Sequence, residues 1–378
     1  MGTVRVAYFI DHLKVGGAQK HLVEVLRHLD RQRFSPQVWT LRGEGELIPA
    51  VESLGVPVRS FGLGARLQEM RSLRLFARAV RQLHQERVHI VHCYLSFANV
   101  VGTLTAALAR VPVLLVSKRS LDSYPRRTEA WGHWAVNRFA DRVVANAAAV
   151  KEFVVRTEGC PADKIVVISN GINDDLVLNG ARERERAALG LGPRDCVVGT
   201  LGRLAWKKGH EYFLQAAAEI LREEPEVTFV LVGDGPLRQQ LEEQAHTLSI
   251  ASRVKFLGQR LDSQEVISLF DVFVLPSVIE GMPNALLEAM VLERPVVVTN
   301  VGGNAEVVTN GETGLVVPPR QPMEMARAVT RLLHDEGLAR RLASAGRRAV
   351  TQRFCFRHTL HAMETLYEKL LEEKGVRV

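Results

Sequence analysis

Cysteine is scarce in this chain of 378 residues, which contains only four thiols. The four are far apart in the sequence, and no two have the spacing of a metal site or a redox pair. We therefore expect reduced thiols in a cytoplasmic protein rather than the disulfide framework of a secreted one. The four positions are Cys93, Cys160, Cys196 and Cys355.

Long apolar runs and several nucleotide-binding motifs are also missing. Nothing approaches the length of a membrane span, and the P-loop and the G-x-G-x-x-G spacing of dinucleotide-binding proteins are absent. The chain has no Asp-x-Asp pair and no histidine, cysteine and carboxylate cluster with metal-ligand spacing. We therefore expect no metal and no cofactor, with phosphate charge met by basic side chains and helix N-termini.

Basic charge is concentrated in the first half. Residues 1–180 contain 24 Lys and Arg against 16 Asp and Glu (24 − 16 = +8), whereas residues 181–378 contain 25 against 26 (25 − 26 = −1). This asymmetry indicates an anionic partner, such as a membrane surface, a phosphorylated acceptor or nucleic acid, or else a general preference for arginine. Aromatic residues are only 6% of the chain and are not interleaved with the arginines, which argues against nucleic acid.

Strand and helix patterns alternate along the chain, and the alternation starts twice, the first time with a strand at Val4–Ile10. Alternating elements indicate parallel sheets with right-handed crossovers, and two series indicate two doubly wound domains. We place these domains at residues 1–180 and 181–378, with a polar linker at residues 170–195. The last helix, Arg357–Lys374, is a candidate to pack back on the first domain.

Two carboxylates frame the most informative segment, Glu280 to Glu288. It follows an apolar run at residues 271–277 that is typical of a buried parallel strand, and it opens a helix with Asn284 as a candidate N-cap. Ligands of open α/β sheets bind at this edge, where helix N-termini favour phosphate. Because carboxylates accept hydrogen bonds from sugar and ribose hydroxyls, we expect a ligand with both hydroxyls and phosphates.

Basic and glycine-rich turns follow other strands of the second domain. Arg203 and Lys208 come after its first strand, at the edge that also carries Glu280. Arginine offers a fork to phosphate oxygens and lysine a mobile charge, so these two predict anion binding, with a solvated basic loop as the alternative. Further turns at this edge are candidate donor contacts: Gly233, Gly258 and Arg260.

The first domain has candidates at the ends of its own strands. Gly16 and Gly17 precede a helix, where glycine lets the backbone approach a phosphate or simply permits the turn. His92 lies near a strand end, where it could serve as an acid, a base or a hydroxyl ligand, or be structural. Four basic residues could hold an anionic acceptor or be solvated: Lys118, Arg119, Arg126 and Arg127.

One segment of the first domain has the pattern of a basic amphipathic helix. Its arginines recur at helical spacing, at Arg71, Arg74, Arg78 and Arg81. A neighbouring apolar stripe is formed by Leu67, Met70, Leu73, Ala77, Val80 and Leu83. Core packing with a solvated outer face is the ordinary interpretation, and docking on anionic lipid headgroups is the other.

Taken together, these residues resemble family 4 of the retaining glycosyltransferases, which have the GT-B fold of two Rossmann-like domains facing a central cleft. The resemblance covers nearly the whole chain. It is carried by Gly16-Gly17-Ala-Gln-Lys20, Gly202-Arg203 with Lys208-Gly209, Val232-Gly-Asp-Gly-Pro236, Glu280-x7-Glu288 and Gly302-Gly-Asn-Ala-Glu306.

The resemblance implies a role for each matching position. Arg203 and Lys208 would bind the diphosphate of a nucleotide sugar, with UDP as the favoured nucleotide, and stabilise the leaving group. Glu280 would hold hydroxyls of the transferred sugar, and Glu288 would hold the ribose. The remaining donor contacts would come from the first-domain turn and from the start of the helix: Gly16, Gly17, Gly281, Met282, Pro283 and Asn284.

One departure concerns the strand that ends at Tyr94. Many relatives have a His-x-His pair there, and the second histidine contacts the donor sugar, whereas this chain reads His92-Cys93-Tyr94. His92 takes that role, or Tyr94 does, or no imidazole serves. We keep His92 as a catalytic candidate beside Arg203, Lys208 and Glu280.

The family implies a retaining, metal-independent enzyme that moves a sugar to a lipid-linked or polysaccharide acceptor, as in envelope glycans such as lipopolysaccharide. Its lipid-linked acceptors favour peripheral contact of the Arg71–Arg81 face with an anionic membrane, at the cytoplasmic side. Two alternatives stay open. A nucleotide-sugar 2-epimerase shares the architecture, although the paired glutamates argue against it, and a nucleic-acid-binding protein is disfavoured by the few aromatics.

Overall fold

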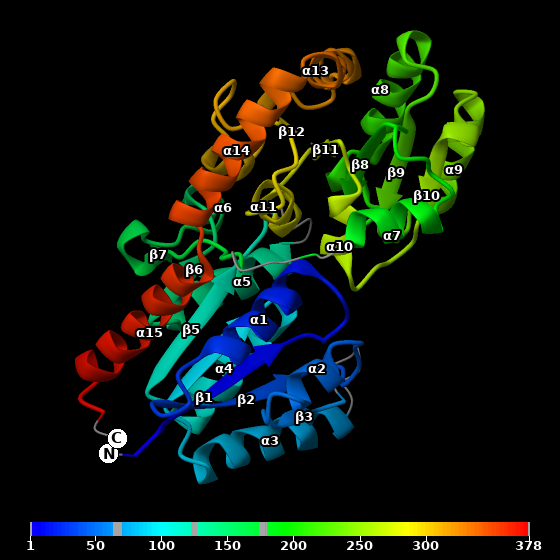
Figure 1. Cartoon of the computed structure of the whole chain (residues 1–378). Helices are drawn as coiled ribbons and strands as arrows, with labels where there is room; N and C mark the ends of the chain where they lie inside the picture. The colour runs from blue at the N-terminus through cyan, green and yellow to red at the C-terminus, as the bar shows by residue number, and fades with distance from the viewer. Residues whose placement is uncertain (1, 63–69, 122–126, 174–177, 179, 377–378) are drawn as a thin grey trace. The chain divides into compact units, whose positions relative to one another are not determined.

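The computed structural model describes residues 2–62, 70–121, 127–173, 178 and 180–376 (Figure 1). It divides into two units, one comprising Met1–Gly171 with Arg357–Val378 and the other Ile172–Phe356. The boundary therefore lies earlier than the predicted one at 180–181. The reason is a short pairing inside the second unit, where the Ile172 amide donates to the Phe354 carbonyl at 2.8 Å and the Phe356 amide donates to the Ile172 carbonyl at 3.0 Å.

The first unit contains a parallel sheet of seven strands in the order β3-β2-β1-β4-β5-β6-β7. Its strands are β1 (Val4–Ile10), β2 (Phe34–Thr40), β3 (Val58–Ser60), β4 (Ile90–Tyr94), β5 (Val113–Lys118), β6 (Arg142–Ala145) and β7 (Ile165–Val167). Its helices are α1 (Gly17–His28), α2 (Ile48–Glu52), α3 (Met70–Gln85), α4 (Ser96–Ala109), α5 (Arg127–Phe139), α6 (Ala148–Glu158), η1 (Ala162–Lys164) and α15 (Phe356–Glu373).

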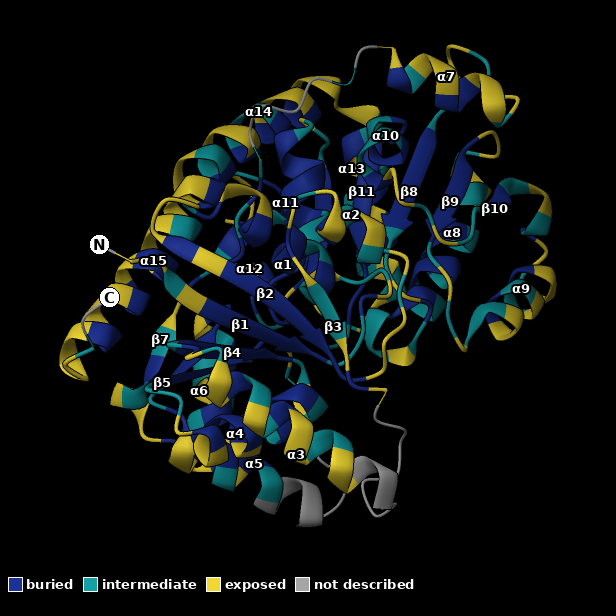
Figure 2. Ribbon diagram, turned by 90° about the horizontal axis from the view of Figure 1, so that it is seen from below, coloured by how far each residue is buried: buried dark blue, intermediate teal, exposed yellow. Residues whose placement is uncertain are grey.

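Helices cover both faces of this sheet, and its strands are apolar for that reason. Figure 2 shows α3, α4 and α5 on one side of the strands and α1 and α15 on the other. All five residues of β4 and all six of β5 are buried. Among the described residues, no helix combines the length and the apolar character needed to cross a bilayer.

The last helix, α15, is part of the first unit. Its Tyr367 is fully buried, and the Tyr367 hydroxyl lies 2.6 Å from Nδ1 of His92 on β4 and donates to the Tyr8 hydroxyl on β1 at 3.3 Å. One turn earlier, the Glu364 carboxylate accepts a hydrogen bond from the Asp30 amide at 3.1 Å. These buried polar contacts fix the helix on the sheet, because an unpartnered hydroxyl or imidazole at this depth is costly.

Helix α3 is rotated relative to the predicted stripe. Leu73 is 57% exposed and Ala77 is exposed too, whereas Ala79 and Leu83 are buried. The buried face is the one that meets α4, so the stripe through Leu73 and Ala77 was wrong. Leu67 lies outside the described residues. Leu73 and Ala77 therefore share the solvent-facing side of α3 with Arg74, Arg78 and Arg81.

The second unit contains a parallel sheet of six strands in the order β10-β9-β8-β11-β12-β13. Its strands are β8 (Val197–Leu201), β9 (Thr228–Val232), β10 (Val254–Phe256), β11 (Val272–Leu275), β12 (Val296–Thr299) and β13 (Leu315–Val317). Its helices are α7 (Ala181–Ala188), η2 (Trp206–Lys208), α8 (His210–Glu223), α9 (Arg238–Thr247), η3 (Ala251–Arg253), α10 (Ser263–Ser268), α11 (Asn284–Val291), α12 (Asn304–Val307), α13 (Pro322–His334) and α14 (Glu336–Arg353).

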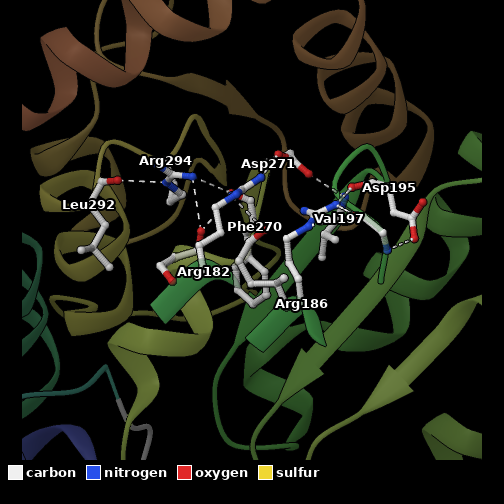
Figure 3. Close-up of polar contacts among 11 residues, drawn as sticks. Arg182, Arg186, Asp195, Val197, Phe270, Asp271, Leu292 and Arg294 are labelled. Atoms are coloured by element: carbon white, nitrogen blue, oxygen red, sulfur yellow. Dashed lines mark hydrogen bonds and ion pairs between the residues drawn. The ribbon is translucent and has the colours of Figure 1, made fainter. Parts of the chain in front are cut away.

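Part of the predicted linker is instead the helix α7, which arginines tie to the amino edge of the second sheet (Figure 3). Arg182 forms an ion pair with Asp271 at 2.6 Å, and the other carboxylate oxygen of Asp271 accepts from the Val197 amide at 2.8 Å. Arg186 donates to the Asp195 carbonyl at 2.6 Å. Arg294 donates to the Phe270 carbonyl at 3.2 Å. Arginine contacts therefore anchor α7, which also packs against α10.

The buried hydroxyl of Tyr367 predicts the response of α15 to a minimal change. Tyr367→Phe removes that hydroxyl and leaves Nδ1 of His92 without its partner, which should cost ~1 kcal/mol. We expect the amides of α15 to exchange with solvent about fivefold faster in hydrogen-exchange mass spectrometry, since local opening follows local stability. Tyr212→Phe on α8 serves as the control. Equal exchange of α15 in Tyr367→Phe and the wild type would contradict this anchoring.

Candidate functional site

The second sheet reverses its strand order between β8 and β11. From β8 the chain continues to β9 and β10 on one side, and then returns to β11 and β12 on the other. The loops after β8 and β11 therefore start next to each other at the carboxyl edge, which is where doubly wound sheets bind ligands. The first loop carries Arg203 and Lys208, and the second carries Glu280.

Backbone contacts hold these two loops together. The Val278 and Ile279 amides donate to the Lys207 carbonyl at 2.7 and 3.1 Å. Gly209 approaches the other loop so closely that a Cβ there would lie 2.1 Å from the Pro276 carbonyl oxygen, and its φ is +65°. Only glycine satisfies both the left-handed conformation and the close approach. This glycine therefore fixes where Lys208, its neighbour, is placed.

The Lys208 ammonium forms an ion pair with Oε1 of Glu280. The same carboxylate oxygen accepts a hydrogen bond from the Ser277 hydroxyl at 2.8 Å. Glu280 is buried, with 7% of its side chain exposed, while 28% of the Lys208 side chain is exposed. Arg203, on the same loop as Lys208, is exposed. The arrangement combines two cations and one desolvated carboxylate at a single edge of the sheet.

Three residues that sequence reasoning missed support the Glu280 loop. The Ser277 carbonyl accepts from the Thr299 hydroxyl at 2.6 Å, and the Thr299 carbonyl accepts from the Asn304 side-chain amide at 2.9 Å. All three residues are fully buried. The sequence could have indicated them by position: Ser277 follows β11, Thr299 ends β12 and Asn304 begins α12. Polar residues at buried strand ends need hydrogen-bond partners.

Helix α11 begins at Asn284, and its N-cap is Pro283, without a side-chain capping bond. The predicted N-cap at Asn284 is therefore wrong by one position. Gly281, Met282 and Pro283 are buried, and Asn284 is half-buried. One helical turn on, the buried Glu288 accepts a hydrogen bond from the Ser263 hydroxyl at 3.1 Å.

The glycines at the neighbouring strands form a close backbone junction. The Gly233 amide donates to the Gly258 carbonyl at 2.8 Å. A Cβ on Gly233 would lie 2.0 Å from the Gly202 carbonyl oxygen, and its φ is +133°. These positions shape the edge beside Arg203 through the backbone alone.

The Arg260 side chain is engaged by carboxylates of the same unit. It forms ion pairs with Glu185 of α7 at 2.7 Å and with Asp262 at 2.6 Å, and these carboxylates raise the pKa of its guanidinium. Oxygens of Glu185, Asp262 and Glu265 lie within 4.8 Å of one another, as a cation site requires. Arg260 and Arg184 occupy this cluster from within the chain. The two arginines offset part of the charge of the three carboxylates, and the Arg260 side chain is engaged by Glu185 and Asp262.

His210 lies behind the Lys208 loop, at the start of α8. Its imidazole is buried, and burial together with the charge of Lys208 lowers its pKa to about 3. It is therefore neutral at physiological pH and adds no charge to the two cations.

In the first unit, Gly16 is the N-cap of α1 and has an extended backbone. A Cβ on Gly16 would lie 2.5 Å from Oε1 of Gln19, at the mobile end of that side chain. Gly17 is exposed. The turn that precedes α1 lies past the carboxyl end of β1, and an anion-binding role for it stays a prediction.

His92 is not available in the way its motif predicted. It is fully buried, with Nδ1 2.6 Å from the Tyr367 hydroxyl and Nε2 2.8 Å from the Ser117 hydroxyl. Burial, assisted by the charge of Arg119, lowers the pKa of His92 to about 3. Both ring nitrogens are engaged inside the unit, and Tyr94 is fully buried as well. The catalytic role of His92 stays a prediction.

The four basic residues predicted to hold an anionic acceptor differ in their surroundings. Lys118 is buried, donates to the Glu158 carboxylate at 2.7 Å and lies 2.9 Å from Nδ1 of His133, which makes it a structural cation. Arg119 donates to Oδ1 of Asn170 at 2.5 Å, and burial lowers its pKa to about 10, so it stays charged. Arg126 lies outside the described residues. Arg127 opens α5, and its side chain is not described.

Two doubly wound units, one of which has a cationic and carboxylate-bearing edge, are the architecture of the GT-B glycosyltransferases. Residues 15–176 match the family model described as Glycosyltransferase Family 4. Residues 195–335 match the one described as Glycosyl transferases group 1. The chain belongs to family 4 of the glycosyltransferases.

Named relatives lie in the same family. An alpha-D-kanosaminyltransferase of Streptomyces kanamyceticus is 33% identical over 68% of this chain and 70% of its own length. The Escherichia coli UDP-Gal:alpha-D-GlcNAc-diphosphoundecaprenol alpha-1,3-galactosyltransferase is 29% identical over 77% of this chain and 79% of its own length. Anabaena HepE with bound UDP-glucose superposes with a TM-score of 0.84 at 27% identity, covering 96% of this chain and 99% of that chain.

Gly209 predicts how sensitive the two loops are to a single methyl group. Gly209→Ala adds a Cβ that would meet the Pro276 carbonyl oxygen at 2.1 Å, whereas Gly190→Ala, at a φ of +68°, meets nothing within 4 Å. Left-handed strain alone should cost Gly190→Ala about 1 kcal/mol, while overlap should raise the cost of Gly209→Ala above about 3 kcal/mol. Urea unfolding of the two variants measures both. Equal losses would mean that the loops are not closely apposed.

Proposed function

We propose that this enzyme transfers a sugar from a UDP-sugar to an acceptor, using the carboxyl edge of its second sheet. The observation that carries the proposal is the meeting of Lys208 and Glu280 where the strand order reverses, with Arg203 on the same loop. Cations suit a diphosphate, and a carboxylate suits sugar hydroxyls. The UDP-glucose bound to HepE and the UDP-Gal in the name of the Escherichia coli relative support uridine as the base.

Lys208 and Arg203 neutralise the diphosphate in this proposal. Negative charge grows on the phosphate oxygen as the glycosidic bond breaks, so cations already in place stabilise the transition state more than the ground state. Lys208 is held by Glu280 before the donor arrives. Donor binding then gives Lys208 a second anionic partner, and Glu280 retains the hydrogen bond from Ser277 while it accepts from the sugar hydroxyls.

Glu288 and the start of α11 complete the donor site. Glu288 accepts from Ser263 through one oxygen, and a carboxylate has further lone pairs for the two ribose hydroxyls. The backbone at Gly281, Met282, Pro283 and Asn284 faces the sugar or the phosphate. In the first unit, Gly16 and Gly17 contribute backbone amides at the N-terminus of α1.

We propose further that the acceptor is lipid-linked or a polysaccharide in envelope glycan synthesis. The diphosphoundecaprenol in the name of the Escherichia coli relative supports a lipid-linked one. Such acceptors lie at a membrane, and Arg74, Arg78 and Arg81 are exposed on α3 for contact with anionic lipid. Arg71 belongs to the same helix, although its side chain is not described. The free thiols at all four cysteines fit a cytoplasmic location.

The affinity for UDP tests the donor site. Lys208→Ala should weaken binding at least about tenfold, because a charge-assisted contact to phosphate is worth ~1.5–3 kcal/mol. Lys207→Ala changes the adjacent lysine of the same turn and should stay within about twofold of the wild type. Isothermal calorimetry with UDP, GDP and ADP measures both the loss and the choice of base. Unchanged UDP affinity in Lys208→Ala would show that the site is misplaced, and tighter GDP binding would overturn the choice of uridine.

Stereochemistry and metal dependence form a second test. We expect the first sugar product from UDP-glucose to keep the α configuration, since the acceptor attacks on the face that the diphosphate leaves. We also expect EDTA to leave the rate unchanged, because Arg203 and Lys208 supply the positive charge. Proton NMR of the anomeric signal at early times gives the configuration. A β product would contradict retention, and loss of rate in EDTA restored by a divalent cation would contradict metal independence.

A further inference from the structure

Large apolar side chains gather at the surface of one layer of helices. Among the described residues, nine large hydrophobic side chains are exposed, and five of these lie on α3, α4 and α5. The five are between 50% and 63% exposed. They are Leu73, Leu104, Leu108, Trp134 and Phe139, and we call them the apolar patch.

The three helices form a continuous layer on one face of the first sheet. Helix α4 contacts α3 on one side and α5 on the other, and it rests on β4, β1 and β5 (Figure 2). Its inner face is buried through Val101, Thr105 and Ala109. Leu104 and Leu108 are four residues apart and therefore point outward together. Neither contributes to the core, so their exposure has no explanation within the unit.

The helices that carry the apolar patch are basic. The segments 70–85, 96–109 and 127–139 contain six arginines and one acidic residue, a balance of +5 (6 − 1). Helices α3 and α4 have no acidic residue at all. The exposed arginines of this layer are Arg74, Arg78, Arg81 and Arg138, with Arg110 directly after α4. Exposed apolar side chains and arginines on the same layer of helices are typical of interfacial membrane helices.

We propose that this face docks on a bilayer of anionic lipids, with Leu104, Leu108, Trp134 and Phe139 entering the headgroup boundary and the arginines contacting lipid phosphates. The proposal deepens the membrane contact suggested for α3, and rests on it, by naming the side chains that insert. A second copy of the chain is a poorer occupant, because a two-fold interface would oppose this positive surface to itself. Nucleic acid is a poorer occupant too, since a central patch of leucines offers no contact to phosphate.

The experiment is co-sedimentation of the full-length protein with vesicles of phosphatidylcholine, with and without phosphatidylglycerol. Leu104→Ser with Leu108→Ser should lower partitioning into anionic vesicles about tenfold or more, because two apolar side chains no longer insert. Arg78→Gln with Arg81→Gln should lower it by a similar factor at low salt. The matched controls are on the second unit: Leu261→Ser with Met323→Ser, and Arg340→Gln with Arg341→Gln. Both controls should bind as the wild type does.

A fluorescence change reports insertion directly. Trp134 should shift its emission to shorter wavelength with anionic vesicles, and Trp134→Phe should lose that shift. Equal partitioning of the patch variants and the wild type overturns the proposal. A patch-dependent dimer in analytical ultracentrifugation, or salt-sensitive gel shifts with nucleic acid but no vesicle binding, also overturns it. UDP affinity is measured on the same samples. Normal UDP binding with failed docking rejects only this inference, while lost UDP binding in the wild type rejects the donor site.

Discussion

A buried carboxylate that must be neutralised organises the second unit. Taking the Glu280 carboxylate out of water costs several kcal/mol unless a cation and a donor compensate it. Lys208 supplies the cation from the loop after β8, and Ser277 supplies the donor from the loop after β11 that also carries Glu280. The ion pair therefore joins the β8 loop to the β11 loop. Because Lys208 is only partly covered, the pair remains open to a third, anionic group.

The surrounding polar contacts make the arrangement rigid before any substrate arrives. Thr299 and Asn304 hold the Ser277 backbone, and Gly209 lets the lysine loop approach Pro276. Preorganised charge is effective in catalysis because no reorganisation is needed when charge develops.

The first unit presents a different surface chemistry. Its layer of α3, α4 and α5 is basic and apolar, so the proposed donor site and the proposed lipid-binding surface differ in chemistry.

Strong local signals allowed much of the fold to be predicted. The strand Val4–Ile10 was placed at both ends because an apolar run is bounded by polar residues. The edge strands β3 and β13 have three residues each and carry too little pattern. Helix α7 falls within a stretch that looked like a linker, because its stability comes from arginine contacts to Asp271 and to distant carbonyls. Such contacts leave no periodic trace in the sequence.

The candidate site, like the fold, was predictable only where the signal is local in the sequence. Glu280, Arg203 and Lys208 could be located because each follows a strand, and parallel strands bring their carboxyl ends to one edge. The side-chain partners of His92 and Arg260 could not be inferred because they are remote in the sequence. Tyr367 is 275 positions from His92, and Glu185 is 75 positions from Arg260. Lys118 was misjudged for the same reason, since a solvated basic pair and a buried ion pair have identical sequences.

Hydrogen exchange of the whole chain with and without UDP tests the central claim most directly. If Lys208 and Glu280 frame the donor site, UDP should slow exchange in the segments 202–210 and 277–288. Exchange around Arg182 and Arg294, at the opposite edge of the same sheet, should stay unchanged. Protection at that opposite edge, with none at the two loops, would contradict the account.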